Sequence, residues 1–164
     1  MHFNDLNKKQ KLALSGVIMA AYIVVMYLTQ GFAFGQYQIR IATAIYALAY
    51  VFPFLVLPLG LSNLLSNLLM GGLGIFDILG GGIVGLLTAG CCAWLGKHGY
   101  APWLTALPVT IVPAFGVSLW LAPILGVPYP LMAASLLVGQ VIAGFAGALL
   151  VKALKRVVRR QEVL

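Results

Sequence analysis

The sequence predicts an all-α integral membrane protein: a single bundle of about six transmembrane helices, formed by one domain over residues 1–164. Two observations predict this fold class. The chain is 62% hydrophobic and only 8% charged, whereas ordinary soluble domains are about 25% charged. In addition, the charges gather at the two ends and leave a long apolar stretch between them. A spanning helix needs about 20 residues, so the stretch 12–151 holds about six such helices if the breaks are short.

The placement of the charges predicts the orientation in the membrane. Basic residues dominate the ends 1–11 and 152–164, and between them only Arg40, Asp77 and Lys97 are charged. Segments rich in Lys and Arg stay on the cytoplasmic side. Six spans bring both termini to one side, so we expect both termini and Lys97 in the cytoplasm. By the same count Arg40 and Asp77 share the outer face, which indicates a binding site there.

The breaks between the spans follow from polar, Gly-rich or proline-containing stretches. We expect spans at about 12–29, 40–52, 55–70, 77–95, 103–121 and 131–150. The second span ends at Pro53 because the residue before a proline is pushed out of helical conformation. Pro108 and Pro113 predict kinks in the fifth span, and three further prolines predict a stiff loop at 122–130.

The stretch 60–85, GLSNLLSNLLMGGLGIFDILGGGIVG, contains three polar groups in an otherwise apolar setting: Asn63, Asn67 and Asp77. A carboxylate there costs roughly 2.5–3.5 kcal/mol on insertion scales, so it needs a partner or a function. Glycines at 71, 72 and 74 break the helical pattern, and we therefore expect Asp77 near the membrane surface, where a new helix begins. Its plainest role is that of a helix N-cap. The alternative is a site for a small polar molecule, built with Arg40.

The other candidate ligand-binding groups lie before this break, in the first outer loop, near the outer end of the fifth span and in the middle of the sixth. Asn63 and Asn67 are four residues apart and share one helix face, and their amides both donate and accept hydrogen bonds. The remaining candidates are Gln36, Tyr37, Gln38, Trp120 and Gln140. Structural roles stay open beside these: Arg40 as a partner of Asp77, the asparagines as bridges between helices, Trp120 as an interfacial anchor and Gln140 as a packing residue.

The first span carries a stripe of small residues, made of Ala13, Gly16, Ala20 and the neighbouring Ala21. Small residues three or four apart let another helix approach closely. Two interpretations stay open: packing inside this protein's own bundle, or a docking face for another membrane subunit. The last span repeats the spacing at Gly139, Ala143 and Gly147, so the spacing alone does not decide between them.

Two runs, QIRIATAIYALAYVFPFLVLPLG at 38–60 and SNLLMGGLGIFDILGGGIVGLLTA at 66–89, resemble the queuosine-precursor S components of energy-coupling factor (ECF) transporters. That family shows an Arg opening the second helix, a Pro closing it, an Asn, a Gly-rich linker, and an Asp followed by a Gly and a Thr. These features fall on Arg40, Pro53, Asn67, Asp77, Gly81 and Thr88. An acidic residue is expected three positions after the Arg, where this chain has Thr43.

The resemblance implies the substrate-binding subunit of an importer in the cell membrane. Such a subunit binds its ligand at the outer face and docks on an ECF module of one T component and two ATPases. The implied ligand is a queuosine precursor, a 7-deazaguanine. Its edge offers adjacent N–H donors, which a carboxylate such as Asp77 accepts in short, charge-assisted bonds. Asp77 alternatively pairs with the aminomethyl cation that some precursors carry.

Energy for transport is expected to come from partner chains. The sequence has no G-x-x-x-x-G-K-[ST] loop, the motif that holds ATP phosphates. We therefore expect no enzyme activity, no cofactor and no metal site in this chain. The net charge of +7 belongs to the basic flanks, and without an aromatic–basic platform it does not indicate a nucleic-acid partner.

Other functions stay open. A stand-alone secondary transporter typically shows inverted repeats and ionisable residues at the midplane, whereas this chain has no clear repeat and both charges near a surface. A membrane enzyme needs its catalytic or metal-binding groups together, and the two histidines, His2 and His98, are far apart in the sequence. Because of Thr43, an S component for another small vitamin-like ligand is the alternative within the resembled family.

Overall fold

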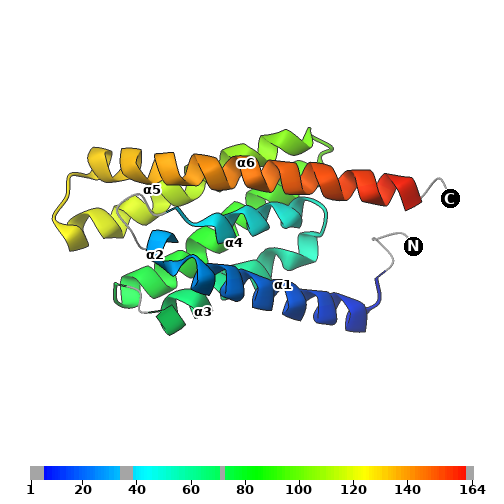
Figure 1. Cartoon of the computed structure of the whole chain (residues 1–164), viewed down its shortest axis with the longest axis horizontal. Helices are drawn as coiled ribbons and strands as arrows, with labels where there is room; N and C mark the ends of the chain where they lie inside the picture. Colours follow the sequence, from blue (N-terminus) through cyan, green and yellow to red (C-terminus); the bar gives the residue numbers. More distant parts are fainter. Residues whose placement is uncertain (1–5, 34–38, 71–72, 162–164) are drawn as a thin grey trace.

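The structure, a computed structural model, describes residues 6–33, 39–70 and 73–161. The described elements are α1 (Lys8–Leu28), α2 (Gln30–Ala33), the 3-10 helices η2 (Ile41–Tyr50) and η3 (Pro53–Leu55), α3 (Val56–Met70), α4 (Ile75–Lys97), the 3-10 helix η4 (Pro102–Thr105), α5 (Ala106–Leu125) and α6 (Tyr129–Gln161). They form one elongated bundle (Figure 1). The candidates Gln36, Tyr37 and Gln38 lie outside the described residues.

Five helical segments in the described part of the chain are long and apolar enough to cross a membrane: Lys8–Leu28, Pro53–Met70, Ile75–Lys97, Pro102–Leu125 and Tyr129–Val157. This confirms the prediction of an all-α membrane protein. The predicted spans at 55–70 and 77–95 match α3 and α4 closely. Phe52 is extended (φ −125°, ψ 81°) and Pro53 opens η3, so the predicted break at Pro53 is also present.

The second predicted span, 40–52, does not form a full spanning helix. Its helix, η2, has ten residues and is a 3-10 helix. At a rise of about 2.0 Å per residue it covers about 20 Å, which is short of the roughly 30 Å hydrocarbon core. Eight of its ten residues are buried, because η2 packs against α1, α4 and α6 inside the bundle.

Two further boundaries differ from the prediction. The expected stiff loop at 122–130 is shorter, because α5 continues through Pro123 and ends at Leu125, where Gly126 adopts a left-handed conformation (φ 66°). The last helix is longer, because α6 runs on to Gln161. The basic segment that follows position 151 is therefore helical up to this residue.

The polar residues of interest lie at one end of the bundle. In Figure 1, α3 ends, α4 begins, η2 begins and α5 ends at the left, whereas α1 begins and α6 ends at the right. We call the left end the Asp77 end. Arg40, just before η2, and Asp77, in the first turn of α4, thus lie at the same end. The side of the membrane that this end faces stays a prediction.

Glycines of α4 bring this helix close to its neighbours. A Cβ atom on Gly85 would lie 3.2 Å from the Cα atom of Gly60 on α3 and 3.0 Å from the hydroxyl oxygen of Tyr46 on η2. A Cβ atom on Gly82 would lie 3.2 Å from the side chain of Leu64. The closeness of α3, α4 and η2 lets short polar side chains reach from one helix to the backbone of the next.

Candidate ligand-binding site

Arg40 lies just before η2 and belongs to a group of buried polar residues that we call the polar cluster: Arg40, Asn63, Asn67, Asp77 and Gln140. The side chain of Arg40 is buried, at 3% exposure. The Nε atom donates to the backbone carbonyl oxygen of Ala33 at 3.4 Å, and Nη1 donates to Oδ1 of Asn63 at 3.3 Å. A guanidinium at membrane depth requires such acceptors. Arg40 therefore joins the segment before η2 to the middle of α3.

Asn63 and Asn67 bridge α3 to α4, as their shared helix face predicts. Nδ2 of Asn63 donates to the carbonyl oxygen of Gly81 at 2.7 Å, and Nδ2 of Asn67 donates to the backbone carbonyl oxygen of Asp77 at 2.9 Å. The absence of a side chain at Gly81 makes room for both amides. A Cβ atom there would lie 2.5 Å from Nδ2 of Asn67 and 3.2 Å from Oδ1 of Asn63.

Asp77 does not cap α4 in the manner considered from the sequence. The N-cap residue is Gly74, and Asp77 is in the first turn. Its Oδ2 atom accepts from the backbone N–H of Leu73 at 3.2 Å, and its Oδ1 atom accepts from the indole N–H of Trp120 at 3.1 Å. The positive end of the helix dipole also stabilises a carboxylate at this place.

Trp120 connects α5 to this carboxylate. Its ring lies directly against Gly80, where a Cβ atom would come within 2.8 Å of the ring carbons. The indole is half-buried, and its N–H group is engaged by Asp77. The structure thus gives Trp120 a defined polar contact at the Asp77 end. A carboxylate oxygen has two acceptor positions, so both oxygens of Asp77 can accept a further hydrogen bond.

Thr43 and Gln140 form a second polar contact, between η2 and α6. Both side chains are buried, at 2% and 3% exposure. The Thr43 hydroxyl oxygen lies 2.6 Å from the carbonyl oxygen of Arg40 and 2.9 Å from Oε1 of Gln140, and its single proton is shared between these two acceptors. Thr43, which replaces the expected acidic residue, therefore has a neutral partner. Thr43 thereby links Gln140 to Arg40.

Two tyrosines extend the cluster toward α1. The hydroxyl oxygens of Tyr22 and Tyr46 are 2.9 Å apart, and their rings stack with centroids 5.5 Å apart. Both side chains are fully buried, and the hydroxyl oxygen of Tyr46 lies against Gly85 of α4. The sequence analysis did not include Tyr46 among the candidate residues. A buried phenol needs a hydrogen-bond partner, and this requirement is the signal that would have added Tyr46 to the candidates.

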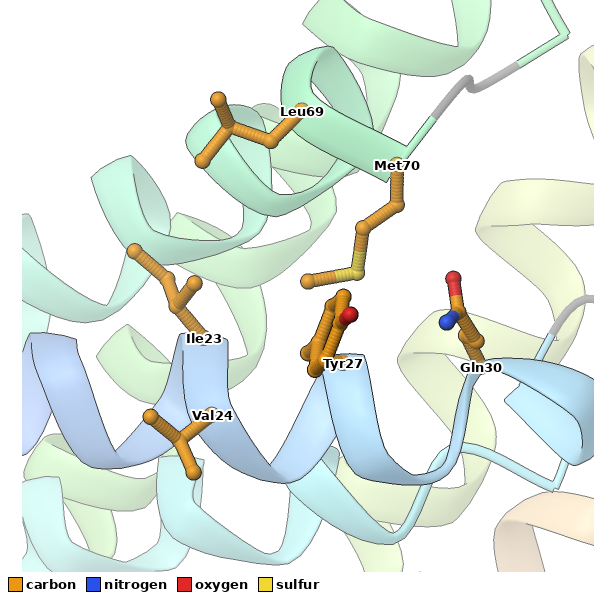
Figure 2. A pocket seen from close by; sticks show the side chains of 6 residues that line it. All are labelled: Ile23, Val24, Tyr27, Gln30, Leu69 and Met70. Carbon is orange, nitrogen blue, oxygen red and sulfur yellow. The ribbon is translucent and has the colours of Figure 1, made fainter.

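A hollow of about 330 Å³ lies between the last turns of α1, Gln30 of α2 and the end of α3 (Figure 2). It is lined by Ile23, Val24, Tyr27, Gln30, Leu69 and Met70. In Figure 2 the side chains of Met70 and Tyr27 point toward one another across it. Among the described residues, its lining is mostly apolar and includes neither Arg40, Asn63, Asn67 and Asp77 nor Trp120 and Gln140. The hollow is therefore separate from the polar cluster.

The two stripes of small residues have opposite environments. On α6, Ala143 is fully buried, and a Cβ atom on Gly147 would lie 2.9 Å from the carbonyl oxygen of Ala44 on η2. On α1 the four small residues Ala13, Gly16, Ala20 and Ala21 are all exposed, and a Cβ atom on Gly16 would have nothing within 4 Å. The stripe on α1 therefore does not pack within the described part of its own bundle.

Comparison with known proteins assigns the family. The family model described as QueT transporter matches residues 12–156 of the 164 residues. No curated protein and no solved structure matches the chain. The match covers all or most of each long helix that the structure describes, and both runs from which the resemblance was inferred. The chain therefore belongs to the QueT transporter family, and it is a multi-pass membrane protein with a role in transport, in bacteria at the plasma membrane.

Proposed function

We propose that this chain is the substrate-binding subunit of an ECF-type importer and that it captures a queuosine precursor at the Asp77 end. The observation that carries the proposal is the buried polar cluster at one end of an apolar bundle, in a chain of a transporter family. Polar groups inside membrane proteins are rare and mark substrate pathways. The cluster consists of Arg40, Asn63, Asn67, Asp77 and Gln140. Hydrogen bonds join Arg40 to Asn63 and Asn67 to Asp77, and Thr43 links Gln140 to Arg40.

The chemistry of the cluster suits a 7-deazaguanine. The edge of such a base presents N–H donors beside a carbonyl acceptor. The carboxylate of Asp77 has acceptor positions left for donors, and the guanidinium of Arg40 attracts a carbonyl oxygen. These groups are at most 3% exposed, so a ligand in contact with them is removed from water. Polar contacts in such an environment are stronger than in water.

The substrate proposal predicts selective binding by the isolated chain. Calorimetric titration of the full chain in detergent should show saturable binding of a 7-deazaguanine. Adenine, which lacks the lactam carbonyl and its adjacent N–H, should bind at least about tenfold more weakly, since a site built to hydrogen-bond such groups rejects analogues without them. Equal binding of both bases, or binding of neither, would contradict the proposed substrate.

We further propose that the exposed stripe on α1 docks on the T component of an ECF module, which two ATPases energise. The outward position of Ala13, Gly16 and Ala20 supports this, since small residues permit close approach of a second helix. Ala13→Leu combined with Ala20→Leu should leave ligand affinity unchanged and abolish uptake in cells that contain the whole complex. The measurements are titration of the purified variant and uptake of radiolabelled ligand.

Ala134→Leu is the matched control for this experiment. Ala134 is also exposed on a membrane helix, but it lies on α6, so the same increase in size should leave uptake intact. Normal uptake by the α1 double variant would remove the docking role from this face. Loss of uptake in all variants would point to a general defect in membrane insertion.

A further inference from the structure

The amide of Asn67 is paired on one side only. Its side chain is fully buried, and its Nδ2 atom donates to the backbone carbonyl oxygen of Asp77 at 2.9 Å. Within the described part of the chain, its Oδ1 atom has no hydrogen-bond partner. Asn63, one helical turn earlier, differs in this respect, because both ends of its amide are engaged, by Arg40 and by the carbonyl of Gly81.

The orientation of the Asn67 amide is fixed by its surroundings. Exchange of Oδ1 and Nδ2 would place the amide oxygen against the carbonyl oxygen of Asp77, and two acceptors repel one another. The backbone at Asp77 is itself held, because its carboxylate accepts hydrogen bonds from Leu73 and Trp120. Even a single Cβ atom at Gly81 would lie 2.5 Å from Nδ2 of Asn67, so the amide fits closely against α4. Asn67 therefore presents a fixed, uncommitted acceptor at the Asp77 end.

A buried acceptor without a donor is costly and is usually satisfied in native proteins. We infer that Oδ1 of Asn67 accepts a hydrogen bond from the exocyclic amino group of the ligand and selects for bases that carry this group. This inference rests on the proposed function. The order of donor and acceptor groups in the cluster agrees with this inference. The cationic Arg40 contacts Asn63, and the Oδ1 acceptor of Asn67 lies one turn further along α3. On one edge of the base, a carbonyl group would face Arg40 and an amino group would face Asn67.

The test compares two probes that differ only in the amino group: 7-deazaguanine and 7-deazahypoxanthine. Titration of the full wild-type chain should show at least about tenfold tighter binding of 7-deazaguanine. In Asn67→Leu the ratio of the two affinities should fall by about tenfold from its wild-type value, and any preference that is left comes from the contact of Asp77 with the same amino group. Asn67→Ala, which needs less room, provides a second variant, and melting curves of both variants show whether they fold.

Asn63→Leu is the matched control. It removes an amide from the same helix face, but one whose oxygen is already engaged by Arg40. Both probes should bind it more weakly, with their ratio unchanged from wild type. A wild-type chain that binds both probes equally, or a folded Asn67 variant that keeps the wild-type ratio, would overturn the inference and leave the proposed function standing. Binding of neither probe to wild type would overturn both.

Discussion

Asp77→Asn is expected to lower the affinity of the chain for a 7-deazaguanine by on the order of 10²-fold or more. If the carboxylate accepts two ligand N–H groups, the amide removes the charge and turns a donor toward donors. Unpaired hydrogen bonds of the charged type cost roughly 1.5–3 kcal/mol each, and about 1.4 kcal/mol corresponds to a tenfold change in affinity. Calorimetric titration of wild type and variant measures the change.

The contacts of Asp77 require a control that separates ligand binding from scaffolding. Its two oxygens accept from Leu73 and from Trp120, and an asparagine amide has one acceptor oxygen for these two donors. The variant is therefore also expected to lose about 1–3 kcal/mol of stability through one unsatisfied group. Trp120→Phe removes the indole donor, so in this background Asp77→Asn no longer leaves that group unsatisfied.

A double-mutant cycle with Trp120→Phe then decides between the two roles. If Asp77 contacts the ligand, the 10²-fold loss of affinity should persist in the Trp120→Phe background. An affinity that Asp77→Asn leaves unchanged in this background would show that the carboxylate acts only through Trp120, and the acceptor role of Asp77 would be rejected.

Gly81→Ala is expected to weaken both ligand binding and folding. The added Cβ atom would lie 2.5 Å from Nδ2 of Asn67 and 3.2 Å from Oδ1 of Asn63, so both buried amides must move. Overpacking of this kind typically costs about 1–3 kcal/mol. Displacement of Asn67 should in addition lower ligand affinity by about tenfold or more. Thermal unfolding and titration of the same preparation measure the two effects.

Gly90→Ala provides the control on the same helix. A Cβ atom at Gly90 would have nothing within 4 Å, so this variant should bind ligand like wild type. It should be equally stable or more stable by roughly 0.5–1 kcal/mol, because alanine favours the helix. A Gly81→Ala variant with the melting temperature and affinity of wild type would show that the two amides are not confined as the structure indicates.

Much of the fold followed from the apolar runs and their breaks, and the exceptions have physical reasons. The spans that form α3 and α4 were predicted because Pro53 and the Gly-rich stretch before Asp77 mark their limits. The 3-10 geometry of η2 was not predicted, because the apolar pattern of a segment as short as IATAIYALAY does not distinguish a 3-10 helix from an α-helix. The length of α6 was underestimated because the charge change after position 151 does not end a helix of good helix formers.

The residues of the candidate site could be predicted from the sequence, but their hydrogen-bond partners could not. Buried asparagines, a buried arginine and a buried glutamine in apolar spans are conspicuous in the sequence, since each requires partners. The bond from Trp120 to Asp77 spans 43 residues, and Thr43 meets Gln140 across 97. Such contacts depend on which helices are neighbours, which the order of apolar runs does not specify.

The shallow attachment of α1 has a consequence for motion within the bundle. In α1, about 11% of the apolar 18-residue stretch is buried, against 39–44% of the corresponding stretch in the other long helices. Tyr22 and Met26 are the only buried residues of α1. In a lipid environment helices associate through packing and hydrogen bonds rather than through the hydrophobic effect. Displacement of α1 therefore breaks fewer contacts than displacement of any other long helix. The helix that carries the outward stripe of small residues is thus the long helix with the lowest local stability.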